Sequence, residues 1–307
     1  MRIHAYSMSS QYTIVKWNSV FKLKFETHFY CLSLFLFFYM EYLELVILGT
    51  LAGFLGALLG IGGGVLLVPS LVFFFHVPIH QAVAVSLIAI IATSTQVASF
   101  GIQHGFANVR LGLFLEIASM AGAILSSFVA VRIESHWIER IFSLTLFITA
   151  FLLIRRPKGQ KITLEPNDDV GYFGGQYYDP AEKKTIAYRV YNLPWVSSFS
   201  FIAGMLSGMV GTSGGIFKVP IMNLLGRIPI RAAAVTSSFM IGFTGLGGAI
   251  AYFRAGLVQP ALVAPVVLGI VVGSAVGNRV GVRLKNRWLE WLFAVMLIVA
   301  AIKMGIK

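Results

Sequence analysis

The chain of 307 residues carries 24 Lys and Arg against 12 Asp and Glu, and hydrophobic residues make up 57% of it. Charged residues reach only 12%, about half the share of a typical soluble domain, so the composition excludes an ordinary soluble globular protein. The net charge of +12 fits Lys and Arg in short loops and at helix ends, where they orient membrane helices and contact lipid headgroups. No nucleic-acid partner is expected.

Residues 1–40 form an N-terminal extension of mixed, weakly patterned sequence. Its last part, "YCLSLFLFFY", is apolar but short. Three interpretations stay open: a cleaved signal, an extra helix, or a start codon assigned too early. A signal peptide should end in a small-residue cleavage site, and "LFFYMEYLE" offers none. The sequence therefore favours a start at Met40.

The rest of the chain is dominated by apolar segments. No Asp, Glu, Lys or Arg occurs from Leu45 to Val109, a stretch far longer than the roughly 20 residues that one membrane-spanning helix needs. We therefore expect an all-α, polytopic protein of the cell membrane. The expected helices lie near 42–60, 65–75, 80–101, 110–131, 137–154, 194–210, 216–226, 232–253, 257–279 and 288–304.

Two of these segments, 65–75 and 216–226, are too short to cross a bilayer alone. They are predicted to be half-helices, tilted helices or parts of re-entrant hairpins.

A polar segment at 155–192 separates two groups of apolar segments. Its many Lys and Arg place it in the cytoplasm by the positive-inside rule, and β-formers that alternate around "DPAEKK" predict a small hairpin. The expected organisation is an N-terminal extension at 1–40, a first transmembrane repeat at 41–154, this cytoplasmic linker at 155–192 and a second transmembrane repeat at 193–307.

The two groups of apolar segments form an internal repeat. A shift of 151 residues aligns "LAGFLGALLGIGGGVLLVP" (51–69) with "IAGMLSGMVGTSGGIFKVP" (202–220) without a gap. Farther along, Thr93 meets Thr244 in the same register. An odd number of passes in each half turns the second half over relative to the first. The sequence thus predicts an inverted repeat with glycine-interrupted helices, a common design of secondary transporters.

Small residues recur every four positions in one pair of matched segments. Such spacing lets two membrane helices approach closely, so we assign these residues to packing. They are Gly269, Gly273, Gly277 and Gly281, with Ala118, Gly122, Ser126 and Ala130 in the first half.

The glycine runs "GIGGG" (60–64) and "GTSGG" (211–215) occupy matched positions. A helix that begins after each run presents unpaired amides with partial positive charge, which suits an anion. Lys218 adds a full charge that its counterpart Leu67 lacks. The alternatives are close packing or a hinge for the glycines, and a place at the membrane interface for Lys218. The candidate substrate-binding residues are Gly62, Gly63, Gly64, Thr93, Thr212, Ser213, Gly214, Gly215, Lys218 and Thr244.

Glu116 is an acid inside an expected span, and its repeat-mate is Val267. Three roles stay open for it: a proton carrier, a salt-bridge partner, or a residue near the interface. The single cysteine, Cys31, allows no internal disulfide, and no Cys/His metal cluster or GxxxxGK[ST] nucleotide motif occurs. No cofactor is therefore indicated.

Each glycine motif is followed by the pattern "P-x-x-x-A-x-x-x-S", and the chain closes with "LEWLFAVML". Together these motifs resemble the sulfite exporter TauE/SafE family. The resemblance covers about 42–304. It implies export or uptake of small sulfur-containing anions, such as sulfite or an organosulfonate. The leading hypothesis is a secondary transporter that moves such an anion across the membrane with coupling to an ion gradient. Ser213 stands where the first half has glycine.

A channel or carrier for a different ion or small solute is the alternative, although the near-absence of acids in the spans speaks against cations. A sensor acting through the hairpin is a further class. A membrane enzyme needs a nucleophile–base pair or a metal site, and the spans offer neither, so no enzymatic activity is expected. The expected partners are a small anionic substrate and the lipid bilayer. The sequence leaves the oligomeric state open.

Overall fold

The computed structural model describes residues 40–58, 62–103, 105–155, 170–179, 184–212, 214–281 and 287–306. The chain divides into two units between Glu44 and Leu45. Of the first unit only Met40–Glu44, the start of a helix, are described. The expectations for the earlier residues and for Ser213 therefore lie outside the described residues. Everything below concerns the second unit.

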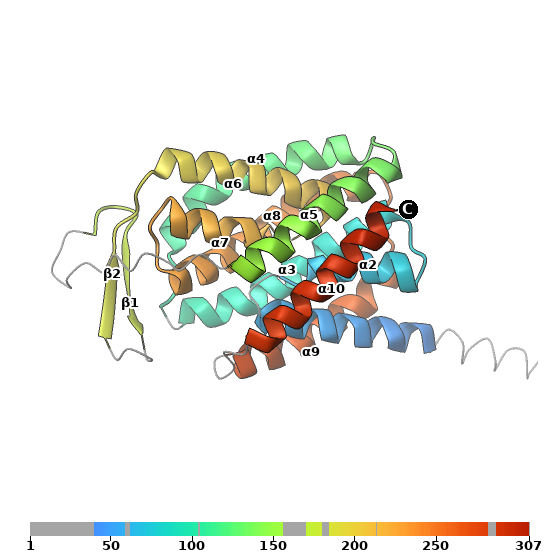
Figure 1. Ribbon diagram of the computed structural model, residues 1–307, viewed down its shortest axis with the longest axis horizontal. Helices are drawn as coiled ribbons and strands as arrows, with labels where there is room; N and C mark the ends of the chain where they lie inside the picture. Colours follow the sequence, from blue (N-terminus) through green and yellow to red (C-terminus); the bar gives the residue numbers. More distant parts are fainter. Residues whose placement is uncertain are drawn as a thin grey trace, which may run out of the picture. The chain divides into compact units, whose positions relative to one another are not determined.

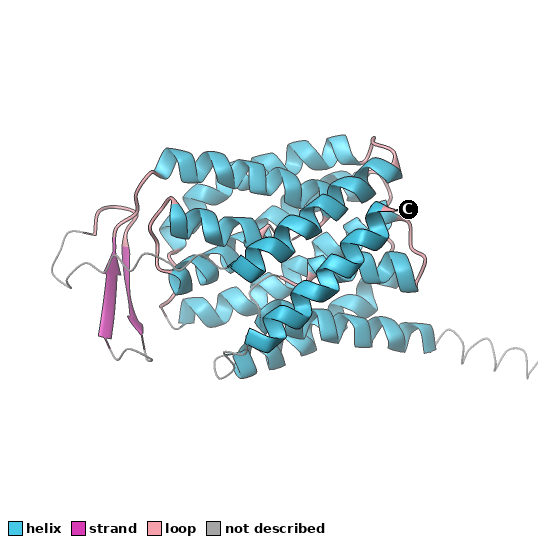
Figure 2. Cartoon of the chain, in the orientation of Figure 1, coloured by secondary structure: helices cyan, strands magenta, loops and turns pink. Residues whose placement is uncertain are grey.

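Helices make up almost all of this unit (Figures 1 and 2). The first is the N-terminal helix, Met40–Leu58, which belongs to this unit from Leu45 onwards. It carries no label in Figure 1. The other elements, in chain order, are α2 (Gly64–Phe74), α3 (Ile79–Gln103), α4 (Val109–Ala130), α5 (Ser135–Arg155), β1 (Gly175–Asp179), β2 (Lys184–Tyr188), α6 (Leu193–Val210), α7 (Gly215–Leu224), α8 (Ile230–Arg254), α9 (Pro260–Gly281) and α10 (Arg287–Gly305).

The described residues include 7 helices that are long and apolar enough to cross a membrane. α2 and α7 are shorter apolar helices, which agrees with the two short segments read from the sequence. Large apolar side chains face outwards, as on α4, where Ile117 is 74% exposed and Leu125 58% exposed. Many serine and threonine side chains within the helices, such as those of Ser86, Thr93 and Thr244, are buried instead. This inside-out distribution matches a protein surrounded by lipid, so the chain is a multi-pass membrane protein.

The first helix of the second half, α6, packs along α4 of the first half (Figure 1). Glycines make this approach possible. A β-carbon on Gly204 would overlap the carbonyl oxygen of Ser119, and one on Gly122 would overlap that of Phe201. Backbone-to-backbone contact of this kind is typical of small residues between membrane helices.

The N-terminal helix packs on α9 in the same way. A β-carbon on Gly53 would lie 2.6 Å from the carbonyl oxygen of Ile270, and one on Gly273 would overlap that of Thr50. These four positions are the 151-residue mates of the four contact positions between α6 and α4. Each half thus contributes its first helix to the other half by matching contacts. The inverted orientation of the halves across the membrane remains a prediction.

Left-handed glycines start both short helices. Gly63 has φ 74° and precedes α2, and Gly214 has φ 61° and precedes α7. This region of φ strongly favours glycine, which explains why the helical path can break and restart inside an apolar body.

The segment between the halves holds an antiparallel hairpin in which Tyr177 pairs with Ile186. Both side chains are buried in an apolar cluster with Leu111 of α4 and Val196 of α6. The hairpin lies at one end of the helices, at the left of Figure 1. Its place in the cytoplasm remains a prediction.

Gly204→Ala and Gly53→Ala should each lower stability by about 1–3 kcal/mol, because the added methyl forces packed backbones apart. Thermal unfolding in detergent, followed by loss of the monodisperse species, measures this. Val129→Ile adds a methylene at an exposed position of α4 and should change nothing. Unchanged unfolding temperatures for both glycine variants would contradict the matched packing.

Candidate functional site

The two glycine turns lie against each other in the interior. Ser86 of α3 bridges them, because its hydroxyl donates to the carbonyl of Gly211 at 2.6 Å and lies 3.3 Å from that of Gly64. A β-carbon on Gly64 would stand 2.7 Å from the Gly211 carbonyl oxygen. The two glycine turns are thus in direct backbone contact.

Each turn leads into the N-terminus of a short helix. At α7 the carbonyl of Gly214 accepts from the amides of Phe217 and Lys218. The amides of Gly215 and Ile216 therefore come before the regular helical hydrogen-bond pattern. The unpaired amides at such an end carry partial positive charge. Thr212 is buried, and its hydroxyl has no hydrogen-bond partner among the described residues. The second turn therefore offers a spare hydroxyl donor beside a positive helix end.

A buried ion pair lies one turn into α7. Lys218 Nζ donates to Glu116 Oε2 of α4 at 3.1 Å and to Thr244 Oγ1 of α8 at 2.7 Å. Thr244 Oγ1 in turn donates to Glu116 Oε1 at 2.6 Å. Ser119 Oγ lies 3.2 Å from Thr244 Oγ1. The single hydroxyl hydrogen of Thr244 has two acceptors, Glu116 Oε1 and the more distant Met240 carbonyl at 3.3 Å. Donation to either one leaves Ser119 as the donor to Thr244.

Glu116 and Lys218 are the only charged side chains buried among the described residues. Lys218 is 0% exposed, so its ammonium does not extend to the surface of the protein. Removing one member of a buried pair leaves an unpaired charge, which costs more than removing both. The pair therefore behaves as one unit that ties α4, α7 and α8 together.

Thr93, the repeat-mate of Thr244, lies in a different environment. Its hydroxyl donates to the carbonyl of Ala89 one turn back. It lines a small cavity beside the first glycine turn, and this cavity has room for about one water molecule. The lining residues are Gly56, Gly62, Thr93, Ser94, Val97, Ser238 and Ile241.

The matched positions of the two halves therefore differ in charge. Lys218 and Glu116 hold one another beside Thr244, whereas their mates are Leu67 and Val267 and the corresponding threonine is Thr93. The site is duplicated in backbone but charged in one copy only.

The predicted residues separate into two groups. Gly64, Thr212, Gly214 and Gly215 lie at or next to the meeting glycine turns, with Lys218 and Thr244 in the ion-pair network. Gly62 and Thr93 line the small cavity, and Gly63 caps α2. Ser213 lies outside the described residues.

The sequence indicates a possible salt bridge for Glu116, but it does not indicate that the partner is Lys218. The sequence does hold one signal for this pair: an acid and a base that both fall inside expected spans, because charges buried in a membrane protein usually occur in pairs.

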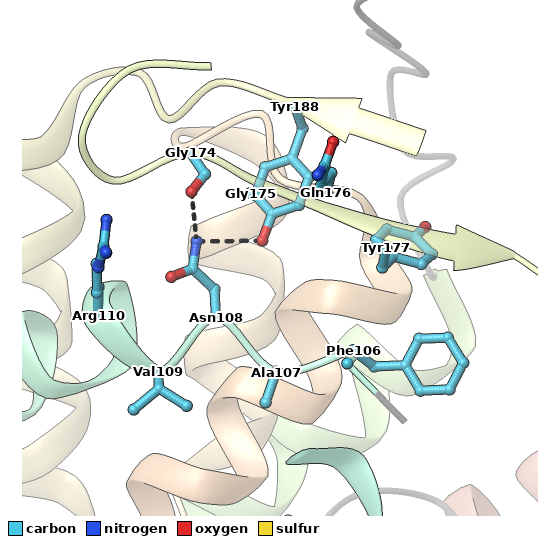
Figure 3. A pocket seen from close by; sticks show the side chains of 11 residues that line it. Phe106, Ala107, Asn108, Val109, Arg110, Gly174, Gly175, Gln176, Tyr177 and Tyr188 are labelled. Carbon is cyan, nitrogen blue, oxygen red and sulfur yellow. Dashed lines mark hydrogen bonds between the residues drawn. The ribbon is translucent and has the colours of Figure 1, made fainter. Parts of the chain in front are cut away.

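A second, more open pocket of about 250 Å³ lies where the hairpin covers the α3–α4 loop (Figure 3). Asn108 organises it. Its side-chain amide donates to the Phe173 carbonyl at 2.8 Å and to the Tyr188 hydroxyl at 3.2 Å, while its oxygen accepts from Leu111 N at the start of α4. Burial raises the pKa of Tyr188, and the hydrogen bond from Asn108 partly offsets this. The phenol therefore stays neutral at neutral pH.

Asn108 also connects the hairpin to the helices of the ion pair. Its backbone amide donates to Thr236 Oγ1 of α8 at 3.0 Å. Thr236 precedes Thr244 on α8, and Asn108 precedes Glu116 at the start of α4. Asn108 therefore links the hairpin to α4 and to α8, the two helices that contact Lys218.

The ion pair predicts a non-additive mutant cycle. Glu116→Val and Lys218→Leu, which install the residues of the other half, should each destabilise the protein by about 3–5 kcal/mol because the remaining charge is unpaired. The double variant should recover most of this loss. Thermal unfolding in detergent tests the cycle, and a double variant as unstable as the sum of the singles would contradict the pairing.

Asn108→Ala should loosen the hairpin and leave the helices intact, since several part-buried hydrogen bonds of about 1 kcal/mol each are lost. Hydrogen–deuterium exchange of residues 175–188 measures this. Gln176→Ala, an exposed change on the same strand, is the matched control and should not alter exchange. Equal protection in the two variants would show that Asn108 does not hold the hairpin.

Comparison with known proteins agrees with this architecture. The family model "Sulfite exporter TauE/SafE" matches residues 45–304. The probable membrane transporter protein YunE of Bacillus subtilis is 28% identical over 72% of this chain and 81% of its own length. A probable membrane transporter protein of Haemophilus influenzae is 26% identical over 85% of this chain and 97% of its own length.

No solved structure matches the chain. The family match nevertheless covers nearly the whole helical body, including both glycine turns and the ion pair. The chain therefore belongs to the sulfite exporter TauE/SafE family of membrane transporter proteins.

Proposed function

We propose that the protein is a secondary transporter that moves a small anion, sulfite or an organosulfonate, through the region where the two glycine turns meet. The observation that carries this proposal is the direct contact of the turns beside a buried lysine. Half-helix N-termini that meet near the middle of a membrane protein are a recurring substrate site in secondary transporters.

The chemistry of the site favours an anion. Lys218 and Thr244 already hold a carboxylate, that of Glu116, by charge and hydrogen bonds. Sulfite and sulfonate groups present the same kind of charged oxygen acceptors, and charge-assisted hydrogen bonds to such oxygens are the strong ones. Thr212, six residues before Lys218 in the second glycine turn, supplies the spare donor. A cation would meet the positive ends of two helices instead.

The site is closed in this structure, because Lys218 is 0% exposed and Thr212 is 2% exposed. Movement of an anion therefore requires the helices to open towards one side at a time, and glycines that break a helix are natural hinges for such a change. The sequence contains no nucleotide-binding motif, so an ion gradient is the proposed energy source. Transport, rather than catalysis, is the proposed activity.

The proposal predicts saturable uptake of radiolabelled sulfite into proteoliposomes that hold the intact chain. The Glu116→Val, Lys218→Leu double variant should lose at least about tenfold in uptake, equivalent to roughly 1.4 kcal/mol, while it stays folded. Thr95→Ala, an exposed change on α3, is the matched control and should transport normally.

Radiolabelled methanesulfonate tests the organosulfonate class in the same vesicles. Absence of saturable flux for both anions would contradict the proposed substrate class. Undiminished flux in the double variant would leave a transporter whose site lies elsewhere.

A further inference from the structure

We propose that Glu116 is the proton-binding residue of this transporter, and that its carboxylate and the substrate anion take turns as the counter-ion of Lys218. The inference rests on the proposed function and adds the identity of the coupling ion. The supporting observation is the geometry of the buried network. The Glu116 carboxylate is paired with the Lys218 ammonium, which is the group that an incoming anion would bind.

Charge balance is the first argument. Lys218 is fully enclosed, and its Nζ forms an ion pair with Glu116 Oε2 at 3.1 Å. A buried ammonium with no counter-ion is strongly destabilising, and so is an ammonium facing two anions. The closed protein therefore tolerates one negative charge beside Lys218. That charge belongs either to the Glu116 carboxylate or to the substrate.

The neighbouring helices offer no competing group at this position. Helices α6, α7 and α8 surround Glu116 on α4. The described part of α6 contains no titratable side chain, and α7 contains Lys218 alone. On α8, Arg231 lies over the ring of Phe106 near the start of the helix and Arg254 lies in its last turn.

Two other titratable groups lie on the same helices but are engaged away from Glu116. The Tyr252 hydroxyl of α8 donates to a carbonyl of α6 at 3.1 Å. Arg110, at the start of α4, lies over the ring of Tyr172. Glu116 is therefore the group at which a proton changes the charge beside Lys218.

The exchange has four steps, and its charges balance. A proton binds the Glu116 carboxylate, which becomes neutral and releases Lys218. The anion takes the vacated place beside Lys218 and Thr244. The helices then close on one side and open on the other. The anion leaves, Glu116 gives up its proton, and the carboxylate returns to Lys218. One proton thus accompanies one anion in the same direction.

The proton and the anion are coupled because two closed states of the protein are unfavourable. A closed protein with protonated Glu116 and no anion buries an unpaired ammonium, and one with an anion and ionised Glu116 buries an extra negative charge. Both are penalised relative to the paired states, so neither proton nor anion crosses alone. The mates Val267 and Leu67 carry no charge, so of the two matched positions only that of Glu116 can bind a proton.

The test uses proteoliposomes and radiolabelled methanesulfonate, whose charge is constant between mildly acidic and mildly alkaline pH. Counterflow at equal pH measures anion exchange. Accumulation under a pH gradient, with the membrane potential clamped by potassium and valinomycin, measures coupling. One pH unit, acidic outside, should drive roughly tenfold accumulation at one proton per anion.

Glu116→Gln mimics the protonated acid, so it should keep counterflow and lose gradient-driven accumulation. Glu116→Asp keeps a titratable group and should retain accumulation with a shifted pH profile. Glu139→Gln, the same chemical change at the start of α5, is the control and should behave as the intact chain. Gradient-driven accumulation that persists in Glu116→Gln would overturn the assignment.

A measurement on the intact chain tests proton coupling even where Glu116→Gln fails to fold. External methanesulfonate added at equal pH should acidify the lumen, as reported by trapped pyranine. Counterflow without acidification would overturn the proton coupling and leave the proposed function standing. Absence of counterflow for both methanesulfonate and sulfite would overturn the proposed function itself.

Discussion

A positive charge enclosed in the interior of a membrane protein needs a counter-charge, and the arrangement of this site follows from that requirement. Lys218 is 0% exposed and is held by Glu116 and Thr244. These three residues come from α7, α4 and α8. The ion pair and hydrogen bonds of the Lys218 ammonium therefore hold the short helix α7 against the two spanning helices α4 and α8. A buried pair of this kind is weak evidence for added stability but a good device for specifying one arrangement over others.

The two halves share the glycine turns but differ in charge at the matched positions. Left-handed Gly63 and Gly214 let the chain restart a helix in the interior of both halves, and the Ser86 hydroxyl satisfies the Gly211 carbonyl that the break exposes. The mates of the ion pair, Leu67 and Val267, are apolar. The one charged site is therefore built by both halves, with Glu116 from the first and Lys218 from the second, whereas the matched positions are apolar.

Much of the architecture could be predicted from local patterns. Apolar length gave the spanning helices, glycine density gave the two short ones, and alternation around residues 180–184 gave the hairpin. The pairing of Glu116 with Lys218 was not predicted, because the two residues lie in different halves and long-range contacts leave no periodic signal. The attachment of the hairpin through Asn108 was missed for the same reason. The exchange of first helices between halves required three-dimensional contacts as well.

The central claim is that the meeting point of the glycine turns opens to each side of the membrane in turn and holds an anion. Thr212→Cys tests it most directly in a Cys31→Ser background that lacks other cysteines, because the buried Thr212 hydroxyl has no described partner to lose. A membrane-impermeant thiol reagent, applied to either face of oriented vesicles, should label Cys at this position from both sides, and methanesulfonate should slow both reactions. Labelling from neither side, or labelling that the anion does not affect, would contradict the account.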